Sequence, residues 1–105
     1  MTAKSAARAP ATGPAVTLDF DDNRRLARVV GEHDKHLARI EARVGVRLTR
    51  RGNRIAIHGE AGSIDTASAV LNALYERSDH GDLTLAEIDG EIRMVMAEGG
   101  TRHTR

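Results

Sequence analysis

A row of basic side chains behind a short polar segment is the feature of this sequence that most suggests chemistry. The segment reads Gly31-Glu32-His33-Asp34, and it is followed by Lys35, His36, Arg39 and Arg43. Spacings of three and four residues bring side chains to one face of a helix, where these cations could follow a line of phosphates. The competing interpretation is an ordinary solvated helix face, which such charge runs usually form, and the sequence favours it.

A second basic cluster consists of Arg50, Arg51 and Arg54, which flank a predicted turn. A basic hairpin tip could contact nucleic acid or the acidic surface of a partner domain. Exposed hairpins also carry charge because charge opposes edge-to-edge aggregation. The sequence favours neither interpretation over the other.

The residue types of this sequence give little support for a metal site or a catalytic site. His33 and His36 could share a metal ion, but the only further ligands beside them are Glu32 and Asp34. The chain has no cysteine, which excludes thiolate metal sites and disulfides. No Ser/His/Asp set stands in a recognisable motif, so we expect no catalytic residue, no metal and no cofactor in this chain.

Length and composition limit the classes of protein to consider. The 105 residues suffice for one compact domain, but not for that domain together with a nucleotide-hydrolysing one. No apolar run approaches the ~20 residues of a membrane span, and a cysteine-free chain suits a reducing cytoplasm. A net charge of +1 means that nucleic acid could be attracted only by a local cluster. With one Phe, one Tyr and no Trp, the chain lacks the stacking platforms of many RNA-binding domains.

The residue composition at both ends of the chain predicts segments that do not pack into the core. Residues 1–15 are rich in Ala, Thr and Pro without apolar periodicity, which indicates a disordered tail. A transit peptide would carry more arginine and a clearer amphipathic face. Residues 99–105 begin with Gly99-Gly100, which predicts the end of a helix and the start of a linker. The domain is therefore expected over 16–98, and it could be a fragment of a longer protein.

The first half of this domain predicts one strand and two helices. Alternating residues over 16–20 indicate a half-buried strand whose core-facing residues are Val16, Leu18 and Phe20. Asp21 or Asp22 can cap the short helix that follows. A second helix is expected over 35–44, with a left-handed cap at Gly45.

The second half begins with a predicted hairpin. Short alternating runs over 46–49 and 54–58 are separated by a turn in which Gly52 and Asn53 can supply the positive φ. Apolar residues at helical spacing then predict a helix over 63–77 that covers one face of the sheet.

A last helix is expected from Thr84, with Glu87 three residues later completing a capping box. Its apolar stripe consists of Leu85, Ile88, Ile92 and Val95. Such a stripe is usually core, but here it could also dock against another domain or subunit.

The predicted order is β-α-α-β-β-α with one extra C-terminal helix, an α+β fold with an antiparallel three-stranded sheet covered by helices. This order, with a glycine-led tetrapeptide between the first two helices, resembles the type I KH fold, in which a GXXG tetrapeptide clamps the nucleotide backbone. The stretches 29–41, 45–46 and 55–59 carry the resemblance.

Four stretches further resemble the amino-terminal domain of bacterial PhoH-like ATPases: Leu18–Asn23, Arg51–Asn53, Val70–Tyr75 and Asp89–Met94. The similarity extends over about residues 16–97. It implies a cytoplasmic parent in which this domain precedes a P-loop ATPase linked to RNA metabolism and phosphate starvation, with ATP and Mg²⁺ bound by that domain. No G-x-x-x-x-G-K-[ST] motif occurs here, so we expect this chain to have no ATPase activity of its own.

The loop departs from the RNA-binding pattern at Asp34, which stands at the second glycine, and at Glu32. Each carboxylate would repel a phosphate by on the order of 1 kcal/mol, while the helix dipole attracts it by ~0.3–1 kcal/mol. We therefore expect a non-catalytic module with weak, salt-sensitive RNA binding. The candidate residues are Gly31, Glu32, His33, Asp34, Lys35, His36, Arg39, Arg43 and Arg51. The alternative is a protein-interaction module that contacts a downstream ATPase domain or a second copy of itself, without RNA.

Overall fold

The computed structural model describes residues 15–103. The predicted tail lies outside these residues, except that Ala15 already belongs to the first strand. The elements are β1 Ala15–Asp19, α1 Asn23–Val30, a 3₁₀ turn Glu32–Asp34, α2 Lys35–Ile40, a π turn Glu41–Gly45, β2 Arg47–Arg51, β3 Arg54–His58, α3 Ala61–Arg77, a 3₁₀ turn Ser78–His80 and α4 Leu85–His103.

The sheet is three-stranded and antiparallel, with β3 between β1 and β2. The predicted α+β class and the KH-like order of elements are therefore confirmed. Ile57 of β3 lies opposite Val16 of β1 and Leu48 of β2, so these three residues share the face toward the helices. Val16 is nevertheless 38% exposed, contrary to its predicted place in the core, because β1 is an edge strand.

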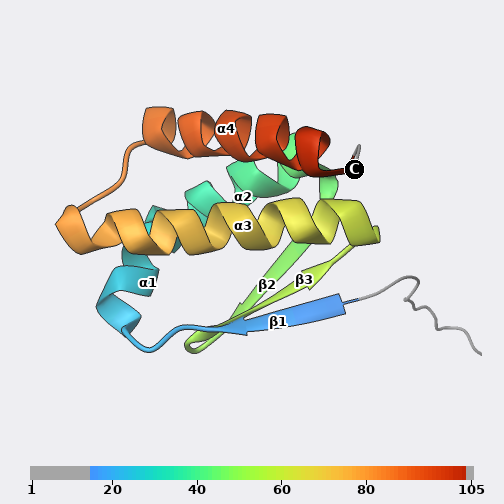
Figure 1. Ribbon diagram of the computed structural model, residues 1–105. Coiled ribbons are helices and arrows are strands. Elements are labelled where there is room, and N and C mark those ends of the chain that lie inside the picture. Colours follow the sequence, from blue (N-terminus) through green and yellow to red (C-terminus); the bar gives the residue numbers. More distant parts are fainter. Residues whose placement is uncertain (1–14, 104–105) are drawn as a thin grey trace, which may run out of the picture.

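The helices all lie on the same side of the sheet (Figure 1). In that view α3 crosses above the strands, and α4 lies on α3 and α2 as a further layer. The core between these layers is aliphatic apart from one aromatic ring. Its fully buried large side chains include Leu26, Ile40, Ile55, Ile57, Leu71, Leu74, Ile88 and Ile92.

The hairpin turn differs from its prediction in one residue. Gly52 has φ 61°, but Asn53 has no positive φ, which is the pattern of a type II′ turn. Asn53 instead ties the turn to the end of β1, because its side-chain amide donates to the carbonyl of Phe20 at 2.9 Å. Its own carbonyl accepts a hydrogen bond from the Phe20 amide at 2.9 Å. Asn53 therefore makes a tertiary contact and does not supply the positive φ of the turn.

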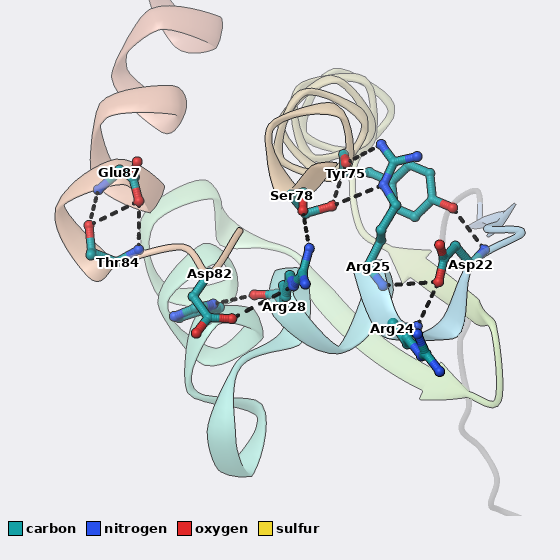
Figure 2. A network of polar contacts seen from close by, with 10 residues as sticks. Asp22, Arg24, Arg25, Arg28, Tyr75, Ser78, Asp82, Thr84 and Glu87 are labelled. Carbon is teal, nitrogen blue, oxygen red and sulfur yellow. Dashed lines mark hydrogen bonds and ion pairs between the residues drawn. The ribbon is translucent and has the colours of Figure 1, made fainter. Parts of the chain in front are cut away.

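Helix α1 is fixed at its beginning and against the end of α3 (Figure 2). Asp22 caps α1 as predicted, and its carboxylate accepts from the backbone amides of Arg24 and Arg25. The Arg25 guanidinium lies 4.2 Å from the centre of the Tyr75 ring and donates to the Tyr75 carbonyl at 2.6 Å. A cation is favourable at this place, because the last carbonyls of α3 carry partial negative charge.

The second helix is shorter than predicted. Regular α geometry ends at Ile40, and a π turn continues the chain to Gly45, whose φ of 85° is the expected left-handed end. Within this turn the carboxylate of Glu41 accepts a hydrogen bond of 2.7 Å from the backbone amide of Leu48. That amide lies on the outer edge of β2, so Glu41 joins the end of the helix to the sheet.

The predicted capping box begins α4, where the Thr84 amide donates to Glu87 and the Glu87 amide donates to the Thr84 hydroxyl (Figure 2). Ile88 and Ile92 of the predicted stripe are fully buried in this chain. The helix continues to His103, so the linker predicted over 99–105 is wrong at its first residues. Glycine weakens a helix by about 1 kcal/mol but removes no hydrogen-bond donor, so α4 can pass through Gly99-Gly100.

One exposed hydrogen bond further joins α4 to α3. The guanidinium of Arg77 donates to Glu91 at 2.8 Å. This hydrogen bond, and the charge of Glu91, raise the pKa of Arg77 above its ordinary value.

No described helix is long and apolar enough to cross a membrane.

The capping box predicts a measurable loss on Thr84→Ala. We expect the free energy of unfolding to fall by about 1 kcal/mol, because the Glu87 amide loses its acceptor. Urea unfolding followed by circular dichroism measures the difference. The control is Thr66→Ala, since the Thr66 hydroxyl only bonds back to the Gly62 carbonyl within α3. Equal losses in the two variants would contradict a capping role.

Candidate nucleic-acid interface

The loop between α1 and α2 has the backbone of a glycine-rich segment, although only its first residue is glycine. Gly31 has φ 78° and ψ 169°, a region that other residues rarely adopt. His33 and Asp34 have φ of 55° and 58°, in the left-handed region. Such angles are unusual for residues with a side chain. Asp34 thus stands where the second glycine was expected, in a conformation that glycine favours.

The three residues after Gly31 are open to a ligand. Glu32, His33 and Asp34 are all exposed. The Asp34 side chain makes no capping hydrogen bond to the start of α2. Its charge is therefore directed at the solvent and at any phosphate that approaches the loop.

His36 does not belong to the exposed row of cations. Its ring is only 3% exposed, and its Nδ1 lies 3.1 Å from the Arg28 carbonyl and 3.2 Å from the Val29 carbonyl. Because both partners are acceptors, Nδ1 carries the proton and donates. The ring also fills the space beside Gly31, where an added Cβ would lie 2.6 Å from its Cγ. His36 therefore caps the carbonyl end of α1 and packs against the loop at Gly31.

Arg39 and Arg43 of the same row are turned toward α4. Their guanidinium groups lie 3.5 and 3.7 Å from the same oxygen of Asp89, which is otherwise buried without a hydrogen bond. The Asp89 side chain is 23% exposed and the two arginines are about two-fifths exposed. The carboxylate therefore offsets much of the positive charge that the sequence suggested for a phosphate.

Lys35 stays exposed, and two residues of α1 join it around an open hollow of about 660 Å³. The hollow is lined by Arg24, Ala27, Arg28, Gly31, Glu32, Lys35, His36, Asp82 and Leu83. Arg28 is partly engaged, since it donates to the Ser78 carbonyl at 2.6 Å and lies 3.7 Å from Asp82 (Figure 2). Three cations thus face two carboxylates around the hollow.

Sequence reasoning missed Arg24 and Arg28, although their four-residue spacing on a predicted helix was a usable signal. The remaining candidate, Arg51, was predicted at the hairpin tip. Arg51 lies at the end of β2, and none of the residues lining the hollow comes from the sheet.

His33 and His36 do not form a metal site with their neighbours. Among residues 15–103, no group of three or more His, Asp or Glu side chains is arranged to hold a metal ion.

No family model matches this sequence. Among solved structures, a protein of unknown function from Aeropyrum pernix superposes on the chain with a TM-score of 0.63 at 20% sequence identity. The match covers 87% of this chain and 50% of that protein, so the chain spans half the length of its structural neighbour. At this identity the likeness shows the fold alone, and the PhoH-like relationship stays a prediction.

The contact between Gly31 and His36 predicts a sharp difference between two glycines with positive φ. Gly31→Ala places a methyl group against the imidazole, so we expect the protein to lose about 3 kcal/mol of stability. Gly45→Ala has a similar φ but open space around the added carbon, and it should lose about 1 kcal/mol. Thermal and urea unfolding of both variants measure this. Similar losses would show that His36 does not constrain the loop.

Proposed function

We propose that this chain is a non-catalytic KH-like module that binds RNA weakly, as the amino-terminal part of a cytoplasmic PhoH-like ATPase. The observation that supports the proposal is the loop backbone, in which Gly31 and Asp34 both adopt angles suited to glycine. These angles turn the chain tightly between the two helices, at the place where the GXXG tetrapeptide of a KH fold clamps the nucleotide backbone. Lys35 stands exposed directly after it.

The expected affinity is low because the charges around this loop nearly cancel. Glu32 and Asp34 repel phosphate, and Asp89 holds Arg39 of α2 and Arg43 of the following π turn, which would otherwise face it. A contact of this kind is dominated by counterion release, so it should weaken steeply as salt is added. RNA would have to be held at several points to bind firmly.

In this proposal the chemistry belongs to a downstream ATPase domain. That domain would bind ATP and Mg²⁺, and the module would guide it to RNA without turning over nucleotide itself.

A second candidate function is protein interaction, in which the domain packs against an ATPase domain or a second copy of itself. The pairing of Asp89 with Arg39 and Arg43 supports this candidate, because it removes cations from the RNA side of α2. The two candidates differ in whether any RNA binding is observed at low salt.

Two substitutions at Asp34 test the RNA proposal. Asp34→Asn removes the charge while keeping a residue that tolerates the left-handed region, and Asp34→Gly removes the charge and the backbone strain together. We expect each to lower the Kd for a short unstructured RNA by roughly fivefold, the equivalent of about 1 kcal/mol. Fluorescence anisotropy across a salt series measures this. Absence of binding by all three proteins at low salt would leave protein interaction as the function.

Asp89→Asn should also strengthen RNA binding, because Arg39 and Arg43 lose their counter-charge. We expect a severalfold lower Kd together with a loss of about 1 kcal/mol in stability. The matched control is Asp65→Asn on α3, an exposed carboxylate with the same charge change and no ion pair within residues 15–103. If both variants lower the Kd for RNA by the same factor, the change in net charge alone explains the effect, and the two arginines are not involved.

A further inference from the structure

The face of the sheet opposite the helices is uncovered in the described chain (Figure 1). Strand alternation assigns nine residues to it, because Ile55 and Ile57 point into the core. They form three rows across the sheet: Ala15, His58 and Arg47; Thr17, Ala56 and Thr49; and Asp19, Arg54 and Arg51. All are exposed except Ala56, which is half-buried.

This open face places two arginines opposite each other, because Arg51 lies directly across from Arg54. Directly opposed like charges destabilise a sheet, whereas pairs of opposite charge would stabilise it. Protection of the hairpin against aggregation needs charge but not this arrangement. The close placement of Arg51 and Arg54 points to an anionic ligand that the arginines bind together.

The positive charge of the face is only partly offset. Asp19 lies 2.9 Å from Arg54, but no described carboxylate lies within ion-pair distance of Arg47 or Arg51. Three arginines and one aspartate make this face more positive than the whole chain, whose formal charge is +1. The remainder of the chain is therefore net negative, and the open face is a positive surface to which an anion can be attracted.

The middle row indicates which part of a nucleic acid would be bound. Thr17 and Thr49 present hydroxyl groups on either side of the small Ala56, so the centre of the face is shallow. Arginine and threonine are common phosphate contacts, and no Phe, Tyr or Trp side chain lies on this face for a base to stack on. Arg47 and Arg51 are four residues apart on β2, or about 13 Å, which is enough for several nucleotides.

We propose that the open sheet face binds the phosphate backbone of single-stranded RNA without regard to base sequence, with Arg47 and Arg51 as its principal contacts. This inference rests on the proposed RNA association and adds a surface separate from the loop. RNA held by both surfaces would compensate for the weak contact at Glu32 and Asp34.

The experiment compares two double variants that remove the same charge. Arg47→Gln with Arg51→Gln alters the sheet face, and Arg24→Gln with Lys35→Gln alters the hollow beside the loop. Anisotropy with oligo-uridine and oligo-adenosine of equal length gives Kd and its salt dependence, and urea unfolding confirms that each variant folds. We expect the sheet variant to bind both RNAs at least tenfold more weakly. Its slope of log K against log salt should be smaller by about 1.4, as for two lost phosphate contacts.

The remaining outcomes separate this inference from the proposed function. RNA binding that is lost in the loop variant but unchanged in the sheet variant would overturn the inference and leave the proposed function intact. Wild-type protein that binds neither RNA at low salt would overturn both. Binding of polyglutamate but not RNA, abolished in the sheet variant, would make the face a docking surface for an acidic protein and overturn the inference as stated.

Discussion

The hydrogen bonds from the imidazole of His36 to the last carbonyls of α1 are the contact on which the arrangement of this loop depends. They satisfy acceptors that a helix end leaves open, and they do so from the first turn of the next helix. The ring also occupies the space above Gly31, so the two helices and the loop between them are held as one unit. A side chain that the sequence suggested as a surface cation is in fact the internal support of the loop.

The arginines fall into two groups, those that make hydrogen bonds or ion pairs between elements of the fold and those that do not. Arg25 and Arg28 bind carbonyls at the end of α3, and Arg39 and Arg43 surround Asp89. Arg47 and Arg51 have no such partner in the described chain, and both lie on the open face of the sheet. A nearly neutral protein can in this way present one distinctly positive surface, because its compensating charges are used inside the assembly of helices.

Local signals were enough to predict most elements of the fold. The alternation over 54–58, the capping box at Thr84 and the positive φ at Gly45 each depend on residues close together in sequence, and all three are confirmed. The Gly99-Gly100 signal failed because glycine disfavours a helix without forbidding it.

The candidate site was predicted less well, since its geometry depends on contacts between distant residues. Asp89 meets Arg39 fifty residues along the chain, and Asn53 meets Phe20 across 33 residues. The four-residue spacing from His36 to Ile40 was a local signal that His36 faces inward, but the space that its ring fills exists only after Gly31 has turned the chain. The sequence could identify the residues of the loop, but it could not show which distant side chains contact them.

The hydrogen bond from Leu48 to Glu41 gives the sheet two unequal edges. On β2, an incoming strand would have to displace a carboxylate from the outer amide of Leu48 before it could pair. On β1, no comparable side chain of the described residues occupies the outer backbone groups of Ala15–Asp19. Addition of a strand is therefore less favourable at β2 than at β1. Fibril-like stacking needs two open edges on every copy, and it is opposed at β2 by one acidic side chain.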